Sequence, residues 1–148
     1  MKFSAKSEYA LRALVDISGY YGQRPIGVRE IAMRQGIPER FLEQQITALR
    51  KAGLVKSQRG AQGGVMLARA PEAITVFEII EALEGPLSTV TCVGNGVPEC
   101  AKNTQCAVQD VWCQVGLAVE RVLRGMTLAQ LAKRQISYDQ SAQPMYHI

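Results

Sequence analysis

Apolar residues recur at intervals of three and four along the first half of the chain, a spacing that predicts short amphipathic helices. The first helix is expected over 4–21, where Ser4 can act as the N-cap and Gly22 ends the pattern. The second helix is expected over 28–35 and should end at Gly36. The residues predicted to face the core are Leu11, Leu14, Ile17 and Tyr21 in the first helix, and Ile31 and Ala32 in the second.

A third helix is predicted directly after the tight turn at Gly36, ending at about Ala52. Pro38 suits its first turn, because an N–H group there would have no partner, and Gly53 lies at a C-cap position. The expected inward residues are Phe41, Leu42, Ile46 and Leu49. Two helices joined by a tight glycine turn, the second rich in polar side chains, indicate a helix-turn-helix.

Two short strand-like segments, 54–58 and 65–69, flank the glycine-rich segment 59–64, which predicts a β-hairpin of the kind called a wing. Thr75 and Glu78 then match a capping box for a helix that ends at about residue 83. The predicted fold class is therefore mainly α with a small β-hairpin: a winged helix-turn-helix.

The second half of the chain contains one long predicted helix, 106–124. The preceding segment, 85–105, is rich in Gly, Pro, Asn and Thr, which oppose regular structure. A short final helix should begin at Thr127, and a loosely ordered tail is expected from about residue 137. The apolar residues of the long helix follow a 4-3-4-3 spacing, typical of a coiled-coil stripe: Val108, Trp112, Val115, Val119 and Val122.

Charge is distributed unevenly between the two halves. Residues 1–69 contain twelve Lys and Arg against five Asp and Glu, a net charge of +7, whereas residues 70–148 contain five against eight, a net charge of −3. The positive half has the sign of a nucleic-acid-binding surface. Because uneven charge is common in soluble proteins, this observation supports the helix-turn-helix interpretation without establishing it.

The second helix of a helix-turn-helix enters the major groove of DNA, so its outward residues are the candidates for base contacts. These are Glu39, Arg40, Glu43, Gln44 and Thr47, while Arg50 and Lys51 lie later on the helix and suit phosphate contacts. At the wing tip, Arg59 beside Gly60 suits the minor groove. Taken singly, each residue is better explained as a solvated surface side chain; taken together with the order of the helices, the glycine turn and the hairpin, they favour a DNA-binding winged helix. Glu43 is repelled by phosphate unless it meets a cytosine amino group, so it could reject unsuitable sites.

Four cysteines indicate a second kind of chemistry. Cys92, Cys100 and Cys106 form a C-x7-C-x5-C pattern, and Cys113 follows within the long predicted helix. The chain shows no signal-peptide pattern and no apolar run of the roughly 20 residues that span a membrane, so a cytoplasmic protein with reduced thiols is expected. Thiolates select zinc, copper(I) or iron–sulphur clusters, and the absence of a close C-x2-4-C pair favours a cluster over zinc. Cys113 lies about 10 Å along the helix from Cys106, so its interpretation as a packing residue is preferred.

The sequence resembles the Rrf-two (Rrf2) family of bacterial winged-helix regulators, with its IscR-, NsrR- and RirA-type iron–sulphur members. The resemblance extends to about residue 134 and rests on SEYALRAL, FLEQQITALRKAGLVKSQRGAQGGVMLAR, TVFEIIEALEG and the three-cysteine segment followed by a Trp-containing helix. It implies a homodimer formed through the long helix, a palindromic double-stranded DNA site, DNA recognition by Glu43, Gln44 and Arg59, and a cluster bound by the three cysteines.

The fourth cluster ligand stays open between three residues. IscR-type members carry a His three residues after the third cysteine, where this chain has Gln109. In NsrR-type members a carboxylate at the position of Glu8 reaches across from the other subunit, so Glu8 is the preferred ligand, ahead of Gln109 and Cys113. A carboxylate or amide binds iron more weakly than a thiolate, which would suit a sensor.

The sequence thus predicts a DNA-binding transcription regulator, a repressor by class, with four parts. Residues 1–84 form the winged helix-turn-helix, 85–105 the cysteine-rich cluster-binding loop, 106–136 the dimerisation helix and short final helix, and 137–148 the tail. A 2Fe–2S cluster is slightly favoured over 4Fe–4S. The alternatives are a thiol-redox or zinc-dependent regulator without iron, and a regulator controlled by a protein partner. An enzyme is not expected, since no acid–base pair, activated nucleophile or phosphate-binding loop is found.

Overall fold

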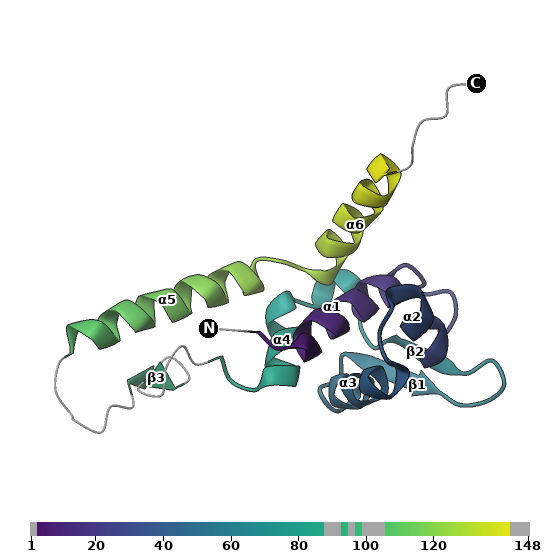
Figure 1. Cartoon of the computed structure of the whole chain (residues 1–148), viewed down its shortest axis with the longest axis horizontal. Helices are drawn as coiled ribbons and strands as arrows, with labels where there is room; N and C mark the ends of the chain where they lie inside the picture. The colour runs from purple at the N-terminus through teal and green to yellow at the C-terminus, as the bar shows by residue number, and fades with distance from the viewer. Residues whose placement is uncertain (1–2, 88–92, 95–96, 99–105, 143–148) are drawn as a thin grey trace.

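The computed structural model of the chain describes residues 3–87, 93–94, 97–98 and 106–142. Three helices, α1 (Ala5–Ser18), α2 (Val28–Gln35) and α3 (Glu39–Lys51), precede a hairpin of β1 (Val55–Gln58) and β2 (Gly64–Leu67). The 3-10 turn η1 (Pro71–Ala73) and helix α4 (Val76–Glu84) complete a winged-helix body, which confirms the predicted fold class. The chain then continues through a two-residue strand pair, β3 (Val93–Gly94) and β4 (Val97–Pro98), to α5 (Ala107–Arg124) and α6 (Leu128–Ala142) (Figure 1).

Capping residues explain where the helices of the body begin and end. The Ser4 hydroxyl accepts a hydrogen bond from the Lys6 N–H at 3.2 Å, which confirms Ser4 as the N-cap of α1. Thr75 and Glu78 form the expected capping box: the Glu78 N–H donates to Thr75 Oγ1 at 3.2 Å, and the Thr75 N–H donates to Glu78 Oε2 at 2.9 Å. Helix α1 ends at Ser18, earlier than the predicted residue 21, because Gly19 caps it and a turn follows.

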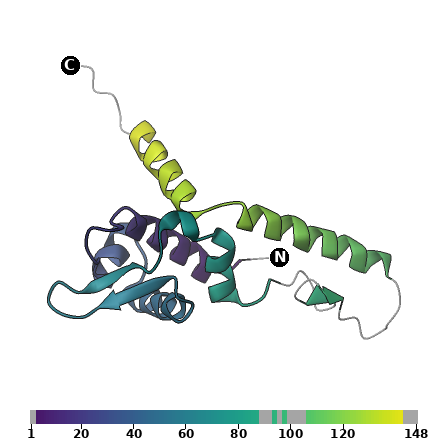
Figure 2. The ribbon, with the colours of Figure 1, turned by 180° about the vertical axis from the view of Figure 1, so that it is seen from behind.

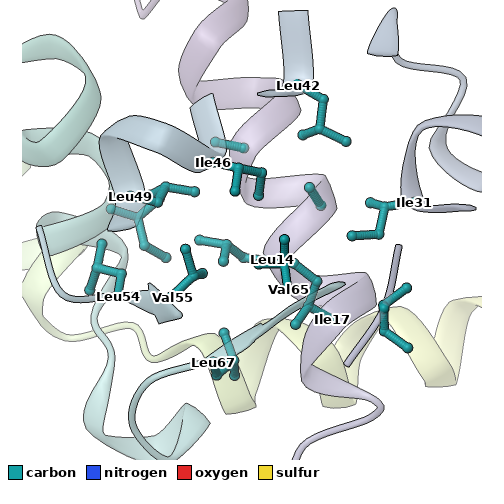
Figure 3. Packing of buried hydrophobic residues seen from close by; sticks show 14 of the residues in the cluster. Leu14, Ile17, Ile31, Leu42, Ile46, Leu49, Leu54, Val55, Val65 and Leu67 are labelled. Atoms are coloured by element: carbon teal, nitrogen blue, oxygen red, sulfur yellow. The ribbon is translucent and has the colours of Figure 1, made fainter. Parts of the chain in front are cut away.

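The core lies where α1 crosses the helix-turn-helix and the hairpin (Figure 3). Leu14 and Ile17 of α1 and Leu42 and Leu49 of α3 belong to one buried cluster, and all four are almost completely buried. The hairpin contributes its inward residues in register, with Val55 opposite Leu67. Phe41 is only half-buried, so the predicted inward face of α3 is correct for Leu42, Ile46 and Leu49 and partial for Phe41.

A third backbone segment holds the hairpin against the body. Ile26 donates to Val65 O at 2.9 Å, and Val65 donates back to Ile26 O at 2.8 Å. A Cβ atom on Gly64 would lie 2.4 Å from the Ile26 carbonyl oxygen, so only glycine permits this close approach. The wing is therefore anchored at its base rather than attached only by its two strands.

Helix α5 extends away from the body, and α6 projects from it in another direction (Figures 1 and 2). The junction between them is fixed to the body: Val76 donates to Met126 O and Leu128 donates to Ile74 O, both at 2.9 Å. The guanidinium of Arg124 also stacks on the Phe77 ring, 3.6 Å from its centroid. The C-terminal end of α5 is thus attached to the winged-helix body.

Helix α6 is longer than the short helix predicted, and it continues to Ala142 through the segment expected to be a loosely ordered tail. Two local contacts support its polar C-terminal half: Gln135 Nε2 donates to Asp139 Oδ1 at 2.8 Å, and the Ser141 hydroxyl donates to Ser137 O at 2.8 Å. The expectation for residues 143–148 lies outside the described residues. Across the part of the chain that the structure describes, no helix has the length and apolar character to cross a membrane.

Candidate DNA interface and cysteine site

Helix α3 has one buried and one exposed face, and the predicted DNA-contacting residues all lie on the exposed one. The buried face comprises Leu42, Gln45, Ile46 and Leu49. Gln45 is the polar member of that face, and its amide donates to Phe41 O at 3.3 Å. The exposed residues are Glu39, Arg40, Glu43, Gln44, Thr47, Arg50 and Lys51.

The positive charges on this exposed face are not neutralised within the described residues. Arg40, Arg50 and Lys51 make no ion pair there, and neither does Arg59 at the wing. Elsewhere in the body, Arg12, Arg24, Arg34 and Arg69 are paired with carboxylates, as Arg34 is with Asp16 at 2.7 Å, and only Arg29 among the described arginines there is not. A charge without an internal partner is available to phosphate, so this pattern is that of a polyanion-binding surface.

Two features fix α3 and its neighbour α2 on α1. The rings of Tyr9 on α1 and Phe41 on α3 meet edge to face, with centroids 5.6 Å apart. Arg34 of α2 binds Asp16 of α1 through its Nε and Nη2 atoms, and its guanidinium also lies over the Tyr20 ring. These hydrogen bonds raise the pKa of Arg34. The recognition helix is therefore held by an apolar contact on one side and an ion-paired helix on the other.

The wing carries Arg59 on a loop that requires glycine. Gly60 has a φ of 113°, outside the region that L-residues favour. A Cβ on Gly63 would lie 2.3 Å from the Gln58 carbonyl oxygen, so the loop closes too tightly for any larger residue. Arg59 is exposed on this tight turn at the end of the hairpin, at the predicted wing tip.

Cys106 is the only one of the three pattern cysteines that the structure describes; Cys92 and Cys100 lie outside the described residues. Cys106 is a half-buried free thiol at the N-cap of α5, and its side chain makes no capping hydrogen bond. Among the described residues, no three His, Cys, Asp or Glu side chains form a metal-binding group.

The three candidates for the fourth ligand lie in different environments. Gln109 is 8% exposed, one turn along α5 from Cys106, and Cys113 is half-buried two turns along. Glu8 is exposed on α1, where it pairs with Arg12 at 3.8 Å and lines a groove between α1 and α6. The end of α5 that carries Cys106 is the end farthest from α1 (Figures 1 and 2), so Glu8 does not approach Cys106 within one chain.

The long helix exposes an apolar face. Val108, Trp112 and Val115 are 63%, 39% and 38% exposed, and Val122 is 61% exposed. Val111 is exposed as well, Val119 of the predicted stripe is half-buried, and α5 contacts both α4 and β3. A row of large, exposed apolar side chains on a projecting helix is a typical protein-contact surface, and it agrees with the predicted stripe at four of its five positions.

Glu84 is a functional candidate that the sequence did not reveal. Its carboxylate, at the end of α4, accepts hydrogen bonds from Ser4 and Ser7 of α1. The partners are 80 and 77 residues away along the chain. No local motif predicts such a contact, because the sequence around Ser4 indicates only a helix cap and the sequence around Glu84 only a surface carboxylate.

Comparison with known proteins identifies the family. Residues 3–134 match the Rrf2 family model, described as an iron-dependent transcriptional regulator. The regulator CymR of Bacillus subtilis is 38% identical over 99% of this chain and 97% of its own. Its structure, described as that of the global cysteine regulator, is similar with a TM-score of 0.78, at 37% identity over 90% of this chain and 98% of its own.

Two further solved structures share the fold. T. potens IscR has a TM-score of 0.78 at 41% identity, covering 99% of this chain and 97% of its own. An oxidised form of Staphylococcus aureus CymR has a TM-score of 0.72 at 33% identity, covering 89% and 96%. The relatives are DNA-binding regulators rather than enzymes. The chain therefore belongs to the Rrf2 family of winged-helix transcriptional regulators.

Proposed function

We propose that the protein is a homodimeric transcription regulator whose DNA affinity is set by an iron–sulphur cluster bound to Cys92, Cys100 and Cys106. The observation that carries the DNA-binding part is the exposed face of α3, whose cations have no ionic partner among the described residues. The cluster part rests on the cysteine pattern and on Cys106, a free thiol at the start of α5.

In the proposed complex, α3 enters the major groove and the wing lies along the minor groove. Arg40, Gln44 and Glu43 contact bases, with the carboxylate of Glu43 accepting from a cytosine amino group. The Thr47 hydroxyl already donates to Glu43 O at 2.9 Å, so toward DNA it acts as an acceptor. Arg50 and Lys51 bind phosphate, and Arg59 with Gly60 binds the minor groove.

The donor set fits a cluster better than a zinc ion, because thiolates at spacings of seven and five can surround a group larger than one ion. When bound, the cluster supplies a redox- and iron-sensitive link between the thiolates. Glu8 of the partner subunit is the proposed fourth ligand, since Glu8 and Cys106 of one chain lie apart. Gln109 and Cys113 are the alternatives within the chain.

Dimerisation follows from the apolar face of α5. Pairing this face with that of a second copy would remove Val108, Trp112, Val115 and Val122 from water. A two-fold symmetric dimer presents two copies of α3 related by the symmetry axis, and the DNA site that matches them is a palindrome.

A thiol-redox regulator without iron is the second candidate. It is favoured by the similarity to CymR, which is described as a cysteine regulator and has been solved in an oxidised form. In this alternative, Cys106 and its neighbours form disulfides or other oxidised thiols, and DNA affinity follows oxidant rather than iron.

DNA affinity of the anaerobic protein tests the proposal. A duplex is first selected from a random-sequence pool, and its Kd is then measured for protein reconstituted with ferrous iron and sulphide and for chelator-stripped protein. The Kd should differ between the two forms and become equal when Cys92, Cys100 and Cys106 are all replaced by Ala. A wild-type Kd that responds to oxidant but not to iron and sulphide would establish the redox alternative.

A further inference from the structure

Glu84 occupies the point where the winged-helix body runs into the cysteine segment, residues 85–105. It is the last residue of α4, and Gly85 caps that helix with a φ of 81°. Glu84 is therefore the residue of the winged-helix body that directly precedes the cysteine segment.

The carboxylate of Glu84 holds the first turn of α1. Its Oε1 atom accepts from the Ser4 N–H at 3.0 Å, from the Ser4 hydroxyl, and from the Ser7 hydroxyl at 2.6 Å. Ser7 is 1% exposed, so its hydroxyl has no access to bulk water as an alternative partner. One oxygen thus binds three donors of a single helical turn.

Helix dipoles favour the contact of the Glu84 carboxylate with the start of α1. A carboxylate at the C-terminus of its own helix is unfavourable, whereas one at the N-terminus of a neighbouring helix is favourable. Glu84 lies at both at once: the end of α4 and the start of α1. The hydrogen bonds from Ser4 and Ser7 lower the pKa of Glu84, so the carboxylate is charged at neutral pH.

The same turn of α1 leads to the recognition helix. Tyr9 follows Ser7 by two residues, and its ring meets Phe41 in the first turn of α3. Phe41 is next in sequence to Arg40, one of the exposed cations of the DNA interface. Glu8, the proposed ligand for the other subunit, lies between Ser7 and Tyr9.

We propose that Glu84 is a positioning residue that transmits the state of the cysteine segment through Ser4 and Ser7 to α1, and from Tyr9 to Phe41 at the start of α3. The inference rests on the proposed function, because it needs a signal at the cysteine segment. Displacement of the end of α4 moves the first turn of α1 with it. The Tyr9–Phe41 contact then changes the position of α3 in the DNA groove.

The test compares the full-length variants Glu84→Ala, Glu84→Gln and Ser7→Ala with wild type. For each, the Kd for the selected duplex is measured after reconstitution with ferrous iron and sulphide and after chelation, and the ratio of the two Kd values is the response. Glu81→Gln is the matched control, because Glu81 is a carboxylate on the same helix without an ion pair among the described residues. Circular dichroism confirms that each variant is folded at the assay temperature.

Coupled sites commonly change each other's affinity by about 5- to 150-fold, and Glu84→Ala should reduce the response to within about 2-fold of unity. Ser7→Ala should reduce it in part. Glu84→Gln should lie between wild type and Glu84→Ala, because an amide oxygen accepts the same bonds without the charge. Reconstitution with iron and sulphide should change the hydrogen-exchange rates of residues 5–9 and 39–43 in wild type and in Glu81→Gln. In Glu84→Ala, the exchange rates of these residues should stay unchanged.

Two results would overturn the inference, and they are distinguishable. A full wild-type response in folded Glu84→Ala and Ser7→Ala rejects the role of Glu84 and leaves the proposed function intact. A wild-type protein whose own Kd is indifferent to loading rejects the proposed function, and the inference falls with it.

Discussion

Replacing Gly64 by alanine should detach the wing from residue 26 and weaken both folding and DNA binding. The added Cβ would lie 2.4 Å from the Ile26 carbonyl oxygen and 2.5 Å from its carbon, both backbone atoms that cannot rotate away. Relief requires the separation of Ile26 from Val65, which breaks both hydrogen bonds of their bridge.

The expected cost follows from those contacts. Two buried backbone hydrogen bonds contribute about 1–3 kcal/mol together, and partial exposure of Ile26 and Val65 adds to this, for roughly 2–4 kcal/mol in all. Urea unfolding followed by circular dichroism should show a lower midpoint at an unchanged slope. Protomer concentration must be held fixed, because the stability of a dimer depends on it.

Gly27→Ala provides the matched control, because it lies beside the same bridge. A Cβ there meets only Glu30 Cβ at 4.0 Å; because Gly27 is the N-cap of α2, where Ala is less favourable than Gly, its free energy of unfolding should fall by at most about 1 kcal/mol, less than that of Gly64→Ala. DNA affinity should fall in Gly64→Ala, and Arg59→Ala should then have a smaller additional effect than in wild type. Equal stability of Gly64→Ala and wild type would refute the argument from the close approach.

Three further predictions concern the DNA interface, the charge network and the dimer. Arg50→Ala should weaken binding to all duplexes alike and reduce the salt dependence of log K by roughly 0.9, whereas Glu43→Ala should change which sequences are selected from a random pool; an unchanged selection would reject the role of Glu43. The hydrogen bond from Arg24 lowers the pKa of Glu30 in the folded protein, so the Glu30 carboxylate stabilises the fold at pH values above the ordinary carboxyl pKa. This stabilisation is lost as the pH falls from the ordinary pKa through the lower folded pKa. Glu30→Gln should therefore flatten the acid side of a plot of stability against pH, and an unaltered curve would contradict this. Val115→Glu should weaken self-association by roughly 100-fold in sedimentation equilibrium, because like charges would face each other across the two-fold axis, and an intact dimer would exclude α5 as the interface.

Local signals in the sequence were sufficient for most of the winged-helix body. Ser4, the Thr75–Glu78 capping box and the turn at Gly36 act over a few residues, so their effects are readable directly. The bounds of α2 agree with the prediction for this reason.

Contacts between distant residues were not predictable in this way. The Ile26–Val65 bridge depends on where the wing packs. No alternation of apolar residues around residue 26 predicts an extended segment there. The C-terminal half of α6 contains Ser137, Asp139 and Ser141, which are poor helix formers, and it is helical because of contacts specific to the helix itself. The prediction of a loose tail from residue 137 was therefore wrong as far as Ala142.

The same distinction between local signals and distant contacts applies to the candidate site. The sequence identified the exposed face of α3 and the position of Cys106 at the start of α5, because both follow from helix periodicity. It could not identify Glu84, whose proposed role depends on hydrogen bonds with Ser4 and Ser7, 80 and 77 residues away along the chain.

The most direct test of the central claim is the iron and acid-labile sulphide content per chain of protein purified without oxygen, measured with its visible spectrum. The account predicts a coloured protein with about two iron and two sulphide per chain if the cluster is 2Fe–2S. Cys106→Ala should lose both, and Glu8→Ala should retain less cluster or lose it faster, with an altered spectrum. A colourless wild-type protein without sulphide, whose DNA affinity follows thiol oxidation alone, would contradict the account.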